Sequence, residues 1–102
     1  MKEPPTEESI LDLLYQESQR KRVKGLKLAC DNPTKKIVDY VILLTKLDES
    51  IKVRRIAIEV LGILLMTEHP ESKLILKAIK SSLANDVSYS VKSLAKEIIE
   101  NQ

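Results

Sequence analysis

The sequence predicts an all-α protein, and three observations support this class. The 102 residues are 43% hydrophobic but only 3% aromatic, so the core must be built mainly from Leu, Ile and Val. Two Gly and four Pro are too few for the many tight turns of an all-β domain. No strand-like alternation persists, whereas apolar residues recur every three or four positions. We therefore expect a single domain, residues 1–102, with one core of packed helices.

Proline and capping residues divide the chain into six expected helices. Thr6 is suited to cap the first helix, because its hydroxyl can accept a bond from an N–H group of the first turn. A turn near Glu17–Ser18 is inferred from the later repeats. Asn32 is expected to cap the third helix with Pro33 at its first position, and Pro70 is expected to begin the fifth. The expected antiparallel hairpins are residues 6–31, 33–65 and 70–100.

A motif runs from Asp48 to Leu64 and recurs along the chain. It resembles the pattern D-x-x-x-x-V-R-x-x-A-x-x-x-L-G-x-L of HEAT-like repeats, of the phycobilin lyase type. The matching positions are Asp48, Val53, Arg54, Ala57, Leu61, Gly62 and Leu64. The same frame recurs at Asp86, Val91, Lys92, Ala95 and Ile99. A degraded first copy is assigned to Ser18, Val23 and Lys24, with Lys27 where a small apolar residue belongs.

This resemblance implies a right-handed α–α superhelix of about three hairpins, whose second helices line a concave face. It also implies that Arg54 pairs with the aspartate of an adjacent repeat, either Asp48 or Asp86. Bilin lyase subunits of this type act on a chromophore and a carrier protein. No residue of this chain matches a chromophore site, so no cofactor is expected.

Helical geometry gives the motif a physical basis. At about 100° per residue, the Val, Ala and Leu positions of the motif form one apolar stripe. A narrow polar wedge is left at Lys52, Arg55, Glu59 and Gly62, so the helix should be buried from two sides. Arg54 falls inside the apolar arc and therefore needs buried acceptors or a path to water.

Two other features of the repeats carry predictions. Asp48 and Asp86 are expected to cap the helices that follow them, because a carboxylate accepts bonds from the unpaired N–H groups of a first turn. The last helix has apolar residues on one side only, which predicts the polar outer face of a terminal repeat.

No catalytic or metal-binding pattern is apparent in the sequence. Cys30 is the only cysteine and His69 the only histidine, so a zinc site or an activated thiol lacks its partners. We expect a non-enzymatic protein with no bound metal or cofactor. The single cysteine, the lack of an apolar leader and the lack of a membrane-length apolar run predict a cytoplasmic protein.

The residues left over for function lie on the second helix of each hairpin. The candidate partner-binding residues are Arg22, Lys24, Lys52, Arg55, Glu59 and Tyr89. The favoured hypothesis is a protein-binding scaffold or a small subunit of a complex. The alternative is nucleic-acid binding through a cluster made of Arg20, Lys21, Arg22, Lys24, Lys52 and Arg55, although the net charge of +2 does not indicate a nucleic-acid binder. Self-association through an apolar flank of the first or third helix is also open.

Overall fold

The computed structural model describes residues 4–102, and within this range the regular secondary structure consists of helices joined by short loops, with no strand. The prediction of an all-α protein is confirmed. The six helices are α1 (Glu7–Tyr15), α2 (Gln19–Asp31), α3 (Lys35–Leu47), α4 (Ile51–Met66), α5 (Ser72–Asn85) and α6 (Tyr89–Glu100). The chain between α1 and α2 is a short non-helical turn, so the first two helices are separate, as the repeat spacing suggested.

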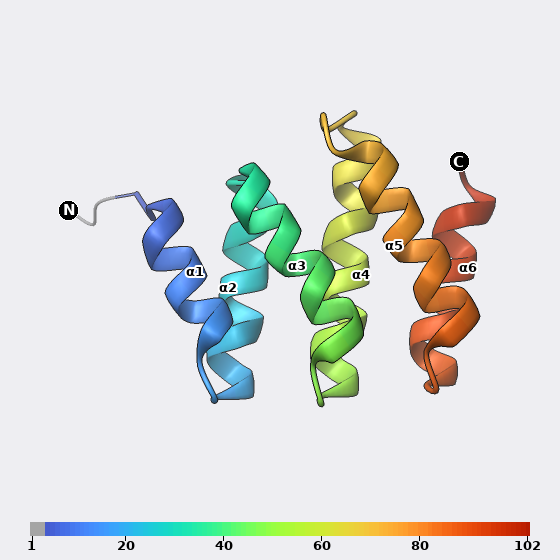
Figure 1. The fold of residues 1–102 in the computed structure, drawn as a ribbon, viewed down its shortest axis with the longest axis horizontal. Coiled ribbons are helices and arrows are strands. Elements are labelled where there is room, and N and C mark those ends of the chain that lie inside the picture. Colours follow the sequence, from blue (N-terminus) through green and yellow to red (C-terminus); the bar gives the residue numbers. More distant parts are fainter. Residues whose placement is uncertain (1–3) are drawn as a thin grey trace.

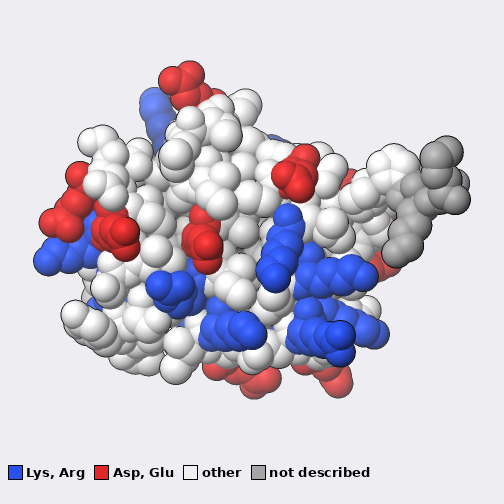
Figure 2. Space-filling view, turned by 180° about the vertical axis from the view of Figure 1, so that it is seen from behind, with Lys and Arg blue, Asp and Glu red and all other residues white. Residues whose placement is uncertain are grey.

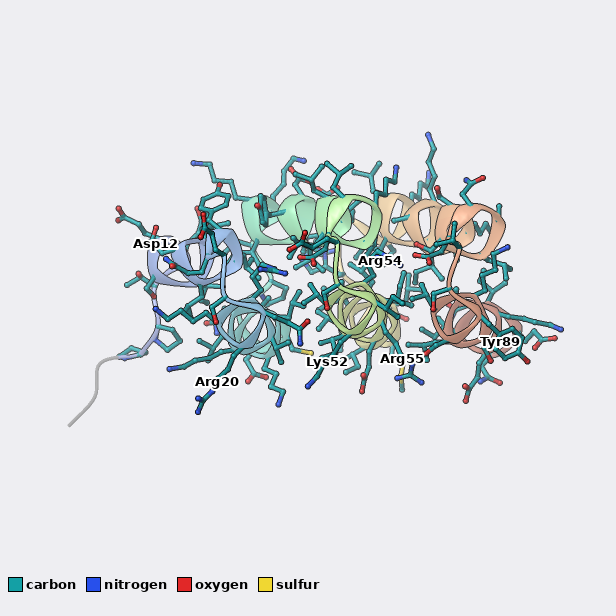
Figure 3. All side chains as sticks on the ribbon, turned by 90° about the horizontal axis from the view of Figure 1, so that it is seen from below. Asp12, Arg20, Lys52, Arg54, Arg55 and Tyr89 are labelled. Carbon is teal, nitrogen blue, oxygen red and sulfur yellow. The ribbon has the colours of Figure 1, made fainter. Side chains whose placement is uncertain are left out.

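The helices form two layers (Figure 1). The helices α1, α3 and α5 lie in front, α2, α4 and α6 lie behind, and consecutive hairpins stand side by side. The view from below shows the same two rows (Figure 3). We call the outer surfaces of these rows the first-helix face and the second-helix face.

Helix α4 holds the centre of the stack, where it packs against α2, α3, α5 and α6. This position explains why its apolar arc is so wide. Its motif residues Val53, Ala57 and Leu61 are fully buried, and so are Val91 and Ala95 of α6. The core thus runs through all three hairpins, from Ile10 and Leu14 in α1 to Val91 and Ala95 in α6.

The predicted caps of α4 and α6 were wrong. Ser50 and Ser88 are the N-caps, and their hydroxyls accept bonds from the backbone N–H groups of Val53 and Val91. Asp48 instead ends α3, as Asp86 ends α5. Each aspartate accepts the N–H of the serine two residues later, at 2.9 and 2.8 Å. The aspartate therefore shapes the loop and leaves the capping to the serine.

Two other helix starts were also predicted too early. Thr34 caps α3, because its hydroxyl accepts from the N–H of Ile37. Asn32 closes α2, since its side chain donates to the carbonyl of Leu28. Pro70 lies in the turn before α5, which begins two residues later at Ser72.

Candidate binding surface

Two arginines of the second helices connect successive hairpins. Arg54 on α4 makes a forked contact with Asp86, from Nε to Oδ2 at 2.9 Å and from Nη2 to Oδ1 at 3.3 Å. Its Nη1 also donates to the backbone carbonyl of Asp48 at 2.9 Å. The side chains of the pair are 11% and 5% exposed, so the charges are held away from water. Asp86 is one of the two acceptors that the repeat resemblance implied.

Arg22 on α2 makes the same arrangement one hairpin earlier. Its Nε and Nη2 bind the two carboxylate oxygens of Asp48 at 2.7 and 3.0 Å. Its Nη1 donates to the backbone carbonyls of Gln16 and Glu17. The hydrogen bond to Asp48 raises the pKa of Arg22, although burial opposes this shift. The prediction that Arg22 faces a partner was wrong, because its side chain is only 9% exposed and is held by these acceptors.

The cause of this error is the register assigned to the first repeat. Ser18 caps α2 just as Ser50 caps α4, so Ser18 corresponds to Ser50 and not to Asp48. Counting four residues from each cap makes Arg22 the equivalent of Arg54. The pairing of Val23 and Lys24 with the motif was therefore two residues out of register. Gly25, not Lys27, takes the small-residue position of Ala57.

The remaining candidate residues are exposed on the second-helix face. Lys52 and Arg55 point away from the other layer, as Figure 3 shows. Lys24 and Glu59 are also exposed, on α2 and α4. Tyr89 begins α6 and is 85% exposed, at the end of the row. The structure thus brings Lys24, Lys52, Arg55 and Glu59 to neighbouring helices and leaves Tyr89 at the edge of the surface.

Exposed cations gather on α2 and α4. Arg20 points outward in Figure 3, and exposed lysines follow it at the i+4 and i+7 positions, which lie on the same side of a helix. With the two cations of α4 they form a surface that we call the basic band, namely Arg20, Lys24, Lys27, Lys52 and Arg55. Figure 2 shows blue side chains collected over this part of the molecule. Lys21 is also exposed.

An apolar groove begins at Glu59, one helical turn after Arg55 of the basic band. It lies between the C-terminal halves of α4 and α6, has a volume of about 370 Å³, and we call it the α4–α6 groove. Its lining consists of Gly62, Ile63, Met66, Leu94 and Ile98, with Glu59, Asn101 and Gln102 at its border. Met66 is 81% exposed and Ile63 43% exposed. Sequence reasoning missed this groove, and its only signals were a glycine inside a helix and a methionine at the helix end.

Gly62 lies where α4 and α6 approach each other at the groove. A Cβ atom at this position would lie 2.7 Å from Cδ1 of Ile98, so the absence of a side chain lets α6 come close to α4. A large residue there would fill the space between the two helices. The close approach of α6 to α4 at the groove therefore depends on the glycine of the motif.

Apolar side chains are also exposed on the first-helix face. Tyr15, Leu43 and Leu47 are 58%, 42% and 71% exposed on α1 and α3. The ring of Tyr15 meets that of Tyr40 edge to face, with 4.5 Å between centroids. Burial, and then the neighbouring Tyr15, raises the pKa of Tyr40. An apolar flank of α1 and α3 is thus present, and self-association through it stays an expectation.

Cys30 and His69 occupy structural environments. Burial, followed by the charges of Asp31 and Glu59, raises the pKa of the Cys30 thiol, which lowers its reactivity. Nε2 of His69 lies 2.6 Å from the carbonyl oxygen of Pro33, and Nδ1 accepts the N–H of Glu71. His69 therefore ties the α4–α5 loop to the α2–α3 loop. Within residues 4–102, no group of three His, Cys, Asp or Glu side chains could hold a metal ion.

Comparison with protein-family models, curated proteins and solved structures gives no match to the chain. No helix in the described part of the chain has the length and apolar character needed to cross a bilayer.

Proposed function

We propose that this chain is a HEAT-like scaffold, a right-handed α–α superhelix that binds a protein partner on its second-helix face. The repeated bridges from Arg22 to Asp48 and from Arg54 to Asp86 support the repeat assignment. The proposed role is non-enzymatic and cytoplasmic, and a single cysteine, whose thiol pKa is raised by burial, suits a reducing compartment. An experimental structure with a left-handed path of hairpins would contradict this architecture.

The observation that carries the proposal is the juxtaposition of charge and apolar surface on one face. The basic band can meet carboxylates, and the α4–α6 groove beside it can bury aliphatic side chains. A protein surface supplies both kinds of group. The side chains of Arg22 and Arg54 are bound to aspartates between successive hairpins. The cations that a partner can contact on this face are therefore the exposed ones of the basic band.

Crosslinking followed by affinity purification tests this function. The wild-type chain should retain specific proteins at moderate salt, because apolar burial persists when charges are screened. Lys52→Glu combined with Arg55→Glu should abolish that retention, and Tyr89→Ala should weaken it.

The matched control reverses two exposed lysines of α5, Lys73→Glu with Lys77→Glu, and should retain the same proteins. Absence of any specific partner of the wild-type chain would contradict the proposal. Equal loss in the α5 control would show that net charge matters and that the second-helix face does not.

A second candidate function is nucleic-acid binding, which the basic band favours by itself. Five exposed cations on two adjacent helices could contact phosphates. A titration of duplex DNA and of RNA at low salt tests this function. Affinity should fall steeply as salt rises, and Arg55→Ala should reduce the salt dependence by about one unit of slope. No retention of either nucleic acid at low salt would dispose of the candidate.

A further inference from the structure

We infer that the basic band and the α4–α6 groove together bind one amphipathic helix of a partner protein, acidic at one end and rich in large aliphatic side chains at the other. This inference rests on the proposed function and specifies its partner. It assigns the acidic end to Lys52 and Arg55 and the apolar stripe to the groove lined by Ile63, Met66 and Ile98.

The groove is suited to aliphatic side chains of a partner. Its lining is mainly aliphatic, and its volume of about 370 Å³ falls within the range of sites that enclose side chains or small ligands. Ile63 and Met66 expose much of their surface to water at the rim. Burying them against leucine or isoleucine side chains would remove apolar area from water. Helical partners provide such side chains in a row at i, i+3, i+4 and i+7.

The order of residues along α4 places a charged region and an apolar region on one side of the helix. Arg55, Glu59 and Ile63 follow at intervals of four, so they lie on one side of the helix. At 1.5 Å per residue, Arg55 and Ile63 are separated by about 12 Å along the axis. A partner helix of about 12 residues would span both regions. The charged region and the apolar region therefore fit one ligand of modest length.

The cations of α4 and α2 are complementary in charge to an acidic segment of a partner. Lys52 and Arg55 are exposed at the N-terminal half of α4, next to the exposed cations of α2. Acidic side chains at one end of the partner would meet these cations. Glu59 borders the groove, so a neutral or basic side chain of the partner should lie opposite it. This pattern places the acidic end of the partner helix over the N-terminal half of α4.

A nucleic acid would use only half of this surface. Phosphates could contact the basic band, but they would leave the aliphatic groove exposed. The two ligand classes thus differ in their dependence on the groove, and a groove variant distinguishes them. A substitution at Met66 is suitable, because its side chain is 81% exposed and its loss should not disturb the core.

The test is a selection followed by a titration. A phage library of random 14-residue peptides is panned against the full chain, and enriched peptides are synthesised and titrated into the ¹⁵N-labelled protein. Enriched peptides should share two acidic residues at one end and aliphatic residues at helical spacing. Amide shifts should concentrate at Gly62, Ile63, Leu94 and Ile98. A 16-base-pair DNA duplex serves as the second probe.

Variants then assign the contacts. Met66→Lys and Arg55→Glu should each weaken the peptide about tenfold or more. Leu47→Lys, at an exposed apolar position of the first-helix face, should change the affinity less than twofold. Melting temperatures near that of the wild type show that each variant is folded.

The possible outcomes separate the inference from the proposed function. The inference would be overturned if no peptide is enriched, or if Met66→Lys does not change the affinity of the enriched peptides. If, in that case, crosslinked proteins are still retained by the wild-type chain and lost with the variant of Lys52 and Arg55, the result would support the scaffold function and reject only the amphipathic helix as the partner. If no peptide is selected, no protein is retained through Lys52 and Arg55, and the duplex binds with an affinity that Met66→Lys does not lower, both are overturned in favour of nucleic acid.

Discussion

At the scale of single residues, Arg54 and Arg55 show that the angular position of a side chain on a helix decides whether it contacts another hairpin or solvent. The two arginines are adjacent, but 100° of rotation turns Arg54 toward Asp86 and Arg55 toward solvent. The sequence predicted this division, because Arg54 fell inside the apolar arc. It could not choose between Asp48 and Asp86 as the acceptor, since that choice depends on how the hairpins stack.

Cys30 provides a test of burial at a single atom. Because burial and the nearby acidic charges raise the pKa of its thiol, the thiolate fraction at pH 8 is smaller in the folded chain than in the unfolded chain. Iodoacetamide should therefore alkylate the native protein more slowly than the urea-unfolded protein. Mass spectrometry measures both rates, and equal rates at pH 8 would refute this environment.

His69 tests a contact between two loops. Its ring nitrogens bind the carbonyl of Pro33 and the N–H of Glu71, which are far apart in sequence. His69→Ala leaves both groups without this partner and should lower the free energy of unfolding by about 1–3 kcal/mol. Urea denaturation followed by circular dichroism measures the change. A variant as stable as the wild type would mean that water replaces the imidazole without cost.

At the scale of helices, the two glycines make opposite predictions. A Cβ atom at Gly25 would lie 3.1 Å from the backbone nitrogen of Leu14 and 2.9 Å from Cδ2 of the same residue. Backbone cannot move aside cheaply, so Gly25→Ala should destabilise the protein by about 1–3 kcal/mol. At Gly62 the obstacle is the end of the Ile98 side chain, which can rotate.

Gly62→Ala should consequently stay within about 1 kcal/mol of the wild type, because alanine favours the helix by about that amount. Thermal melting compares the two variants directly. The reverse order, with Gly62→Ala the less stable variant, would mean that α4 and α6 tolerate less movement than α1 and α2.

The helices were predictable, but their ends and the first register were only partly so. Apolar spacing located the elements because each helix buries one stripe. Asp48 and Asp86 looked like caps, but the ion pairs to Arg22 and Arg54 hold them in the loops. Gln16 lies two residues before the serine cap of α2, where the other two hairpins have an aspartate. Without that aspartate, the motif could not be aligned correctly with the first hairpin from sequence alone.

At the scale of the whole molecule, a serine cap begins the second helix of each of the three hairpins. Lys92 takes the position of Arg22 and Arg54, four residues after a serine cap. Lys96 is exposed where the equivalent Ile58 of α4 is fully buried. The outer side of α6 is therefore polar, in agreement with the terminal repeat that the sequence predicted.

The candidate surface was predictable only in part. The polar wedge of α4 correctly placed Lys52, Arg55 and Glu59 outside, because one helix determines its own faces. Gly62 was assigned to the same wedge but is buried against Ile98. The α4–α6 groove requires two helices from different hairpins and a close approach at Gly62. Contacts of this kind depend on tertiary packing, which the pattern within one helix does not specify.

The measurement that tests the account most directly is urea unfolding of Arg54→Ala beside Arg55→Ala. Both variants lose one positive charge, one position apart, so net charge cancels in the comparison. If Arg54 joins the hairpins, its loss leaves the buried Asp86 unpaired and should cost about 3 kcal/mol. Arg55→Ala should stay within about 0.5 kcal/mol of the wild type. Equal stabilities of the two variants would contradict the division between a bridging arginine and a binding arginine.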